Sequence, residues 1–254
     1  MGVAVAAVLA YMVVVNGIQV SSGIDYQDWF DTAGNAVRTA VIPLAVGNVL
    51  LLAFVWWARW DIFWRDPERL PMSRLATAVI VLFAATVVVR LVGLDWADVP
   101  GDLLLAILAT GVLVGLAEEL VFRGVVLRCL RTGDRPESSA ALWTALGFGL
   151  FHLPNIFMGT GLSGLSQIVL AAISGYALYL FRRWHGLLWV AMVAHGTWDI
   201  SAFLVGDYGK DVAAGAALAL NLVLAVACVV ALIRSLRRDR DFAVRPEGVV
   251  PVAA

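Results

Sequence analysis

Apolar residues run in eight long blocks along the chain, and short polar segments separate them. A transmembrane helix needs about 20 predominantly apolar residues, because each residue adds about 1.5 Å of rise. The pattern predicts eight membrane-spanning helices, at residues 3–20, 37–58, 75–92, 103–129, 139–153, 163–181, 186–205 and 212–233. The fifth is short and ends beside Pro154, where helical geometry is disfavoured.

Composition agrees with a membrane protein. The 254 residues are 61% hydrophobic and 15% charged, whereas soluble domains average about 45–50% apolar and about 25% charged residues. We therefore expect an all-α fold, a polytopic helical bundle in the membrane. Nucleic acid is an unsuitable partner, because no basic face precedes the C-terminal tail. Cys129 and Cys228 have the spacing of neither a disulfide framework nor a zinc motif.

The loops differ in charge from one side of the predicted bundle to the other. Fourteen arginines occur in one set of alternate loops and the tail: Arg59, Arg65, Arg69, Arg74, Arg128, Arg131, Arg135, Arg182, Arg183, Arg234, Arg237, Arg238, Arg240 and Arg245. The opposite loops hold only three cations, Arg38, Arg90 and Lys210, among eight aspartates. Because an excess of Lys and Arg marks the cytoplasmic side, we expect both termini to be cytoplasmic.

This segmentation divides the chain into three regions. Residues 1–100 hold the first three predicted helices, residues 101–233 hold the other five, and residues 234–254 form a basic tail predicted to be cytoplasmic and disordered. Residues 1–20 lack the basic start of a signal peptide, so we interpret them as a membrane helix, with cleavage after about Val20 as the alternative. Four tryptophans are typical of an interfacial belt: Trp56, Trp57, Trp60 and Trp64.

Once the loop cations and aspartates above are set aside, few ionisable groups remain in the predicted helices: Glu118, Glu119, Arg123, His152, His195 and Asp199. A charge at the centre of a membrane helix costs roughly 2.5–3.5 kcal/mol on insertion scales, so such groups indicate a protein interior or a wet cavity. Glu118 lies roughly 22 Å along its helix from the outer side, and the two histidines lie roughly 13–20 Å from the cytoplasmic side. The three helices can therefore bring these groups to one depth.

Residues four apart lie on one helix face. We expect Glu119 and Arg123 to form a supporting ion pair, while Glu118 points about 100° away and stays free for chemistry. The same spacing aligns His195 with Asp199.

Two further patterns bear on this site. Phe148 and His152 are also four apart, so that an aromatic ring lies one turn before the imidazole. The small residues Gly111 and Gly115 would let another helix approach closely, as a site built from several helices requires.

These residue types support two kinds of chemistry. Glu118 and His152 could activate a water molecule as general bases, and a protonated His195 beside Asp199 could stabilise an oxyanion. Alternatively, Glu118, His152, His195 and Asp199 are all suitable zinc ligands, and a catalytic zinc keeps one position for water. The spacing does not distinguish between these routes, so no cofactor is certain and zinc stays open.

The three motifs together, Glu118-Glu119-x-x-x-Arg123, Phe148-x-x-x-His152 and His195-x-x-x-Asp199, resemble the signature of the CPBP intramembrane proteases. That family includes type II CAAX prenyl endopeptidases and bacteriocin-processing or immunity proteins. The resemblance implies a multi-pass intramembrane metalloendopeptidase. Glu118 matches its water-activating glutamate, His152 the partner of that glutamate, and His195 a histidine that helps to stabilise the oxyanion.

Asp199 departs from the enzymes that have asparagine at this position. An ionised aspartate accepts hydrogen bonds but cannot donate them, so we expect Asp199 to orient His195, bind metal or stay protonated. The resemblance also implies a peptide or protein substrate, lipidated or membrane-embedded, and a location in the bacterial cell membrane. It does not establish that the substrate is a prenylated peptide.

Three alternatives remain open at this point. Gly161-Leu162-Ser163-Gly164 resembles the serine motif of rhomboid proteases, with His195 as the potential base. Intramembrane Glu, His and Asp also build the relays of proton-coupled transporters. Finally, the chain could be a non-catalytic scaffold or immunity protein that keeps the fold without turnover.

Overall fold

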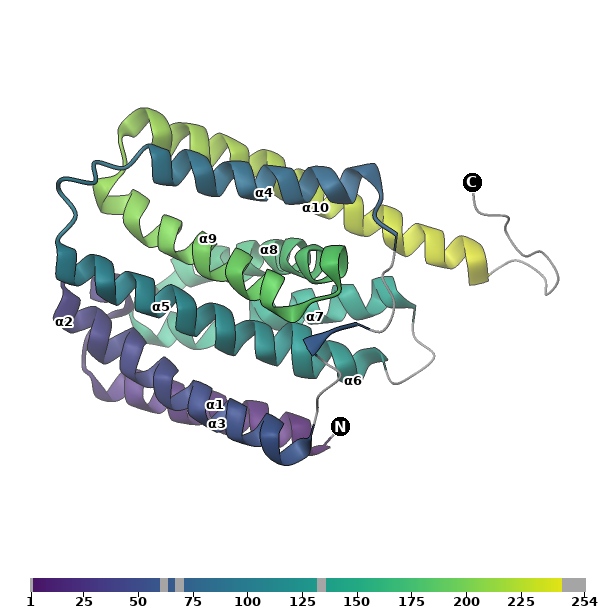
Figure 1. The fold of residues 1–254 in the computed structure, drawn as a ribbon, viewed down its shortest axis with the longest axis horizontal. Coiled ribbons are helices and arrows are strands. Elements are labelled where there is room, and N and C mark those ends of the chain that lie inside the picture. The colour runs from purple at the N-terminus through teal and green to yellow at the C-terminus, as the bar shows by residue number, and fades with distance from the viewer. Residues whose placement is uncertain (1, 60–63, 67–70, 132–135, 244–254) are drawn as a thin grey trace.

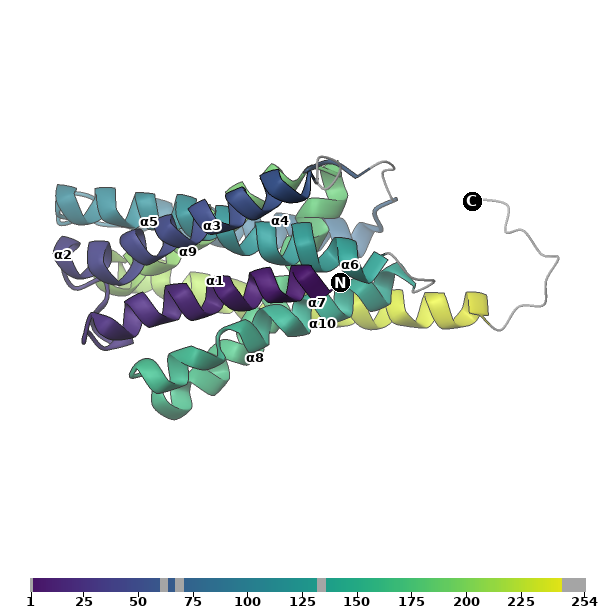
Figure 2. The same cartoon turned by 90° about the horizontal axis from the view of Figure 1, so that it is seen from below.

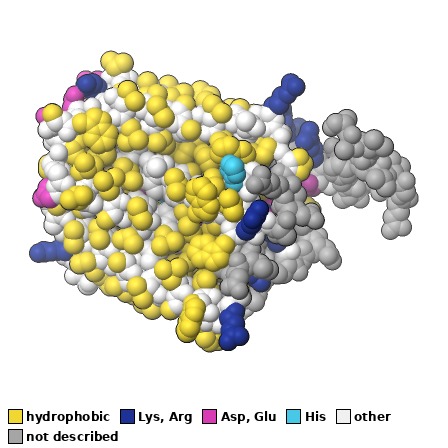
Figure 3. Space-filling model, in the orientation of Figure 1, with side chains coloured by type: hydrophobic (Ala, Val, Ile, Leu, Met, Phe, Trp, Pro, Cys, Tyr) yellow, Lys and Arg dark blue, Asp and Glu magenta, His cyan; other side chains and the backbone are white. Residues whose placement is uncertain are grey.

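The structure is a computed structural model that describes residues 2–59, 64–66, 71–131 and 136–243. In the described chain, eight helical segments are long and apolar enough to cross a membrane. They lie roughly along one axis. The start of α1 and the end of α10 lie at the same end of the bundle (Figure 1). On the face drawn in Figure 3, apolar side chains cover the middle and charged side chains gather toward the two ends. The chain is an integral, multi-pass membrane protein.

The spans are built from the following elements. The first span is α1 (Gly2–Ser21), and the third is α4 (Arg74–Val92). The second span is one continuous segment of α2 (Ala33–Ala36), η2 (Val37–Val41) and α3 (Ile42–Ala58). The fourth is a continuous segment of α5 (Gly101–Glu119), η4 (Leu120–Val126) and α6 (Leu127–Arg131). The last four are α7 (Glu137–Phe151) with η5 (Leu153–Met158), η6 (Gly161–Ser163) with α8 (Gly164–His185), α9 (Leu188–Tyr208) and α10 (Asp211–Ala243). A short turn, η1 (Tyr26–Asp28), lies between α1 and α2.

All eight predicted helices are present, and two boundaries differ from the prediction. The fifth helix ends at Phe151, so His152 is its C-cap (φ −84°, ψ 0°) rather than a residue of the helix. The prediction of a disordered tail from Arg234 was wrong for the first ten residues of that tail, because α10 continues to Ala243. The hydroxyl of Ser138 in α7 donates to Asp239, and this contact holds the extension of α10 against the bundle. Residues 244–254 lie outside the described residues, as does Trp60 of the tryptophan cluster.

The predicted close approach through Gly111 and Gly115 is made by α9. A Cβ added at Gly111 would lie 2.8 Å from the carbonyl oxygen of Gly196, and one added at Gly196 would lie 2.6 Å from that of Gly111. The two backbones therefore touch with no side chain between them. This contact brings Glu118 and Glu119 at the end of α5 to the depth of His195 in α9.

We expect Gly115→Ala to destabilise the protein by about 1–3 kcal/mol, the usual cost of overpacking. The added Cβ would lie 2.4 Å from the carbonyl oxygen of Met192, and a backbone oxygen in α9 has no rotamer with which to move away. Thermal unfolding in detergent measures the effect. Gly17→Ala is the matched control, because a Cβ there has no neighbour within 4 Å. Equal melting temperatures for both variants would contradict this account of the helix contact.

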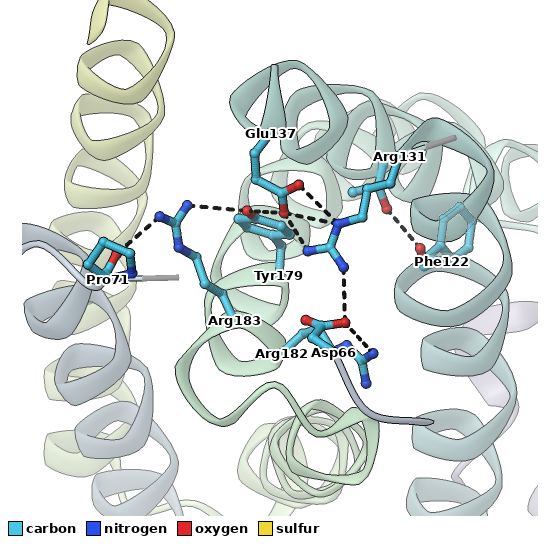
Figure 4. Close-up of polar contacts among 9 residues, drawn as sticks. Asp66, Pro71, Phe122, Arg131, Glu137, Tyr179, Arg182 and Arg183 are labelled. Carbon is cyan, nitrogen blue, oxygen red and sulfur yellow. Dashed lines mark hydrogen bonds and ion pairs between the residues drawn. The ribbon is translucent and has the colours of Figure 1, made fainter. Parts of the chain in front are cut away.

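A polar network closes the arginine-rich end of the bundle (Figure 4). The Asp66 carboxylate accepts from Arg131 Nη1 at 3.0 Å and from Arg182 Nη2 at 2.6 Å. Glu137 accepts from the same Arg131 and from the Tyr179 hydroxyl, the latter at 2.8 Å. The network ties the connection between α3 and α4 to α6, α7 and α8 at this end, away from the intramembrane ionisable groups.

Candidate active site

A cavity of about 550 Å³ lies among the helices. Its wall includes the predicted site residues Glu118 of α5, Phe148 of α7, His152, and His195 and Asp199 of α9. Residues of α1 and α8 also line it, and Figure 2 shows the start of α8 diverging from the rest of the bundle. The structure thus brings together side chains that are up to 81 positions apart in the sequence (118 and 199).

The first motif lies where the backbone changes from α-helix to a wider π-helical segment, η4, directly after Glu119. Such π-helical turns are rare in proteins overall, but those that exist often lie at functional sites. Across this change, Arg123 Nη1 donates to Glu119 Oε1 at 2.7 Å, with both side chains fully buried. Arg123 Nη2 also donates to the carbonyl oxygen of Gly175 at 2.5 Å. The expected ion pair is therefore present, and it connects α5 and η4 to α8.

Glu119 has a second partner that the sequence did not reveal. His195 Nδ1 lies 3.0 Å from Glu119 Oε1, the same oxygen that accepts from Arg123. Arg123, Glu119 and His195 therefore form, in that order, a buried chain of charge-assisted contacts from η4 to α9. Asp199, which the sequence predicts to orient His195, bind metal or stay protonated, makes a longer contact with His195, at 3.6 Å from Nε2 to Asp199 Oδ2. Spacing along one helix revealed the i,i+4 neighbour but not the partner on another helix.

The remaining nitrogen of His195, Nε2, faces two carboxylates. It lies 3.9 Å from Glu118 Oε2 and 3.6 Å from Asp199 Oδ2. Glu118 is 8% exposed, and its Oε2 has no hydrogen-bond partner within the described part of the chain. Glu119 is therefore held by a cation and an imidazole at hydrogen-bond distance, while Glu118 lines the cavity and has only the longer contact with His195.

His152 is held by its position at the end of α7. Its Nδ1 lies 2.9 Å from the carbonyl oxygen of Phe148. Because a carbonyl can only accept, Nδ1 carries the proton, and Nε2 of the neutral ring is left as an acceptor. The Phe148 ring meets both imidazoles edge to face, with centroids 5.1 Å from His152 and 5.4 Å from His195. The Arg123 guanidinium lies over the same ring, 4.5 Å from its centroid.

The sequence analysis missed a charged residue of this cavity, Arg90. The sequence interpretation counted Arg90 among the cations of the outer loops, but its side chain is only 6% exposed and lines the cavity. Arg90 Nη1 lies 3.5 Å from the Ser201 hydroxyl, and its guanidinium lies 4.3 Å from the centroid of Trp198. The available signal was a cation inside the predicted span 75–92. Because Arg90 lies in the last turn of that span, it was interpreted as a loop residue.

The four predicted zinc ligands all line this cavity. In the described part of the chain, no group of three His, Cys, Asp or Glu side chains could hold a metal ion. Both Nδ1 atoms are already engaged, one by Glu119 and one by the Phe148 carbonyl. The arrangement as it stands suits activation of water by side chains.

The serine of the rhomboid-like alternative lies away from this site. Ser163 is exposed, and its hydroxyl donates to the carbonyl oxygen of Thr160 at 2.6 Å. It does not line the cavity that contains His195.

The fold and the site define a class of protein: a multi-pass helical membrane protein with ionisable side chains gathered around one internal cavity. Comparison with protein families agrees: residues 100–201 match the family described as type II CAAX prenyl endopeptidase Rce1-like. The matched region covers all three motifs and supports assignment to the CPBP/CAAX protease family. No curated protein and no solved structure matches the chain.

Proposed function

We propose that this protein is an intramembrane endopeptidase in which Glu118 and His152 activate the hydrolytic water. The observation that carries the proposal is the contrast between two neighbouring glutamates. Glu119 is fully buried and bonds through Oε1 to both Arg123 and His195, whereas Glu118 lines the cavity that His152 also lines, and its ionic contact with His195 is longer, at 3.9 Å. A buried carboxylate that is held this weakly is costly unless it serves a function.

The first step is proton transfer from water. A water molecule in the cavity donates one hydrogen bond to Glu118 and one to the free Nε2 of His152. As the oxygen attacks the carbonyl carbon of the scissile peptide bond, Glu118 takes its proton, and the carbonyl π electrons move to the oxygen. General-base catalysis of this kind contributes about 10²–10⁴-fold to rate.

His195 stabilises the oxyanion that forms. Its Nδ1–H donates to Glu119, which holds the ring and favours its protonated form, so that Nε2–H can donate to the developing negative charge. Asp199, 3.6 Å from the same nitrogen, adds to the stabilisation of the imidazolium. When the tetrahedral intermediate collapses, the carbon–nitrogen bond breaks, and the proton held by Glu118 passes to the leaving amine.

The substrate we propose is a peptide or protein segment, membrane-embedded or lipidated. The cavity is bounded by apolar helices, and many of its wall residues are apolar or aromatic, which suits a chain that arrives from the lipid phase. A cytoplasmic position of both termini and a bacterial cell membrane remain part of the proposal. The arginine-rich end of the bundle supports the orientation.

Comparative proteomics of membranes that contain wild-type protein or Glu118→Gln tests the function. We expect segments that are cut in wild-type membranes to accumulate uncut with the variant. Purified protein should then cleave a synthetic peptide that spans the cut. Identical cleavage patterns would contradict the protease proposal and favour the transporter or scaffold alternatives. Metal analysis of the purified active protein, with a chelator added to the assay, tests independently whether zinc takes part.

A further inference from the structure

Tyr11 is a buried polar residue of the catalytic cavity that the reaction above does not use. It lies in the middle of α1, outside the residues 100–201 that match the family. Its side chain is 1% exposed and forms part of the cavity wall. Among the described residues, its hydroxyl has no hydrogen-bond partner. Buried tyrosine hydroxyls usually have such a partner, so the partner of Tyr11 has to come from the contents of the cavity.

The ring of Tyr11 is held on two sides. One face stacks on Phe151 of α7, with the ring centroids 6.1 Å apart and the two planes 15° from parallel. Gly47 of α3 lies against the ring edge, where an added Cβ would overlap the Tyr11 carbons Cε2 and Cδ2. Because two helices fix the ring, they also fix the position of its hydroxyl.

This position places Tyr11 beside the two residues that activate water. Tyr11 lies roughly 14 Å from the arginine-rich end at which α1 begins, within the depth range of the two histidines. Phe151, on which it stacks, directly precedes His152, and those two rings have centroids 6.0 Å apart. The Tyr11 phenol is also close enough to the Glu118 carboxylate to interact with it electrostatically. Tyr11 therefore borders the part of the cavity in which Glu118 and His152 meet.

The water-activating pair leaves the oxygen of the water without a hydrogen bond. Glu118 and Nε2 of His152 are both acceptors, so each of them takes one hydrogen of the water. Buried water molecules typically make about three hydrogen bonds, and neither of these residues can donate to a lone pair. A phenol can donate to one lone pair, which leaves the other directed toward the substrate carbonyl.

We propose that Tyr11 is a further catalytic residue, whose hydroxyl donates a hydrogen bond to the hydrolytic water and orients it for attack. Tyr11 itself transfers no proton. The proton of the water still passes to Glu118 and then to the leaving amine, and Tyr11 contributes by orientation of the nucleophile. This inference deepens the proposed protease function and rests on it for the turnover test, whereas the spectroscopic test requires no turnover.

The turnover test compares Tyr11→Phe with Tyr176→Phe. Phenylalanine keeps the ring and its packing and removes only the hydroxyl, so both variants should melt like the wild type in detergent. We expect Tyr11→Phe to lower kcat by about 10- to 100-fold, the effect of a misplaced reactant, and to leave KM unchanged. Tyr176 of α8 is also buried, at 3% exposed, but it does not line the cavity, so Tyr176→Phe should cleave at the wild-type rate. An unchanged kcat for Tyr11→Phe, or a raised KM alone, would overturn the inference.

The spectroscopic test observes the hydroxyl directly and needs no substrate. Infrared difference spectra between wild type and Tyr11→Phe, both with isotope-labelled tyrosine rings, isolate the C–O stretch of Tyr11. The frequency of that stretch reports the hydrogen bond that the phenol makes. We expect the band of a hydrogen-bond donor, and we expect it to shift when Glu118→Gln is introduced into both proteins, because the two residues bind one water molecule.

Asp98→Asn, which replaces an exposed carboxylate, is the matched control and should leave the Tyr11 band in place. The band of a hydroxyl without a hydrogen bond would overturn the inference. A band that does not respond to Glu118→Gln would overturn it as well, since Tyr11 and Glu118 would then share no water.

The two tests separate this inference from the proposed function. Cleavage by the wild type that Tyr11→Phe performs equally well would keep the protease function and refute the role of Tyr11. A Tyr11 band that responds to Glu118→Gln, in a protein that cleaves no peptide, would keep the shared water and refute the protease function.

Discussion

Replacing Glu118 with glutamine should lower kcat by at least about 10²–10⁴-fold, the contribution of a general base, and leave the protein folded. Glutamine has nearly the same shape but cannot take a proton from water. Glu118 Oε2 has no hydrogen-bond partner among the described residues, so the exchange breaks no hydrogen bond of that atom and removes only its 3.9 Å ionic contact with His195. The measurement is cleavage of the peptide identified by proteomics, with size-exclusion chromatography in detergent as the check on folding.

His152→Gln should produce a loss of similar size, and the double variant should be little worse than either single one. Residues that act on one water molecule as a unit are strongly non-additive. Asp98→Asn, an exposed carboxylate outside the helices, is the matched control and should cleave at the wild-type rate. If Glu118→Gln or His152→Gln also cleaves at that rate, activation of water by this pair is wrong.

Arg123→Met should destabilise the protein by about 3–5 kcal/mol, the usual cost of removing one partner of a buried ion pair. The change leaves the fully buried Glu119 without its cation and the Gly175 carbonyl without its donor. A lower melting temperature and lower expression in membranes measure the effect. The double variant Glu119→Gln/Arg123→Met should be more stable than Arg123→Met alone, because it removes both buried charges.

The exposed Arg38→Gln is the control for loss of one cation, and it should melt like the wild type. An unchanged melting temperature for Arg123→Met would show that the pair is unimportant for the fold. In that case, the assignment of Arg123 as a support for Glu119 and His195 would have to be given up.

Much of this fold could be predicted because lipid restricts the possible solutions. Buried backbone groups in a membrane must bond within their own segment, so a long apolar block predicts a helix almost by itself. The predictions were wrong where the chain is no longer restricted by lipid. α10 continues through Arg234–Ala243 past its apolar block, held by a contact with Ser138 that local composition does not reveal. His152 lies beyond the last turn of α7 because the chain changes direction before Pro154.

The candidate site divides in the same way. The sequence alone determined which ionisable groups lie in the membrane, and the i,i+4 spacing determined that Glu119 pairs with Arg123. It also supplied the glycines that let two helices touch, but not the identity of the second helix. Only the tertiary structure decided that α9 packs on Gly111 and Gly115, that His195 bonds to Glu119 rather than primarily to Asp199, and that Arg90 faces the cavity. The physical reason is that helical periodicity relates neighbours on one helix, whereas contacts between helices depend on rotation and tilt that are set by packing over their whole length.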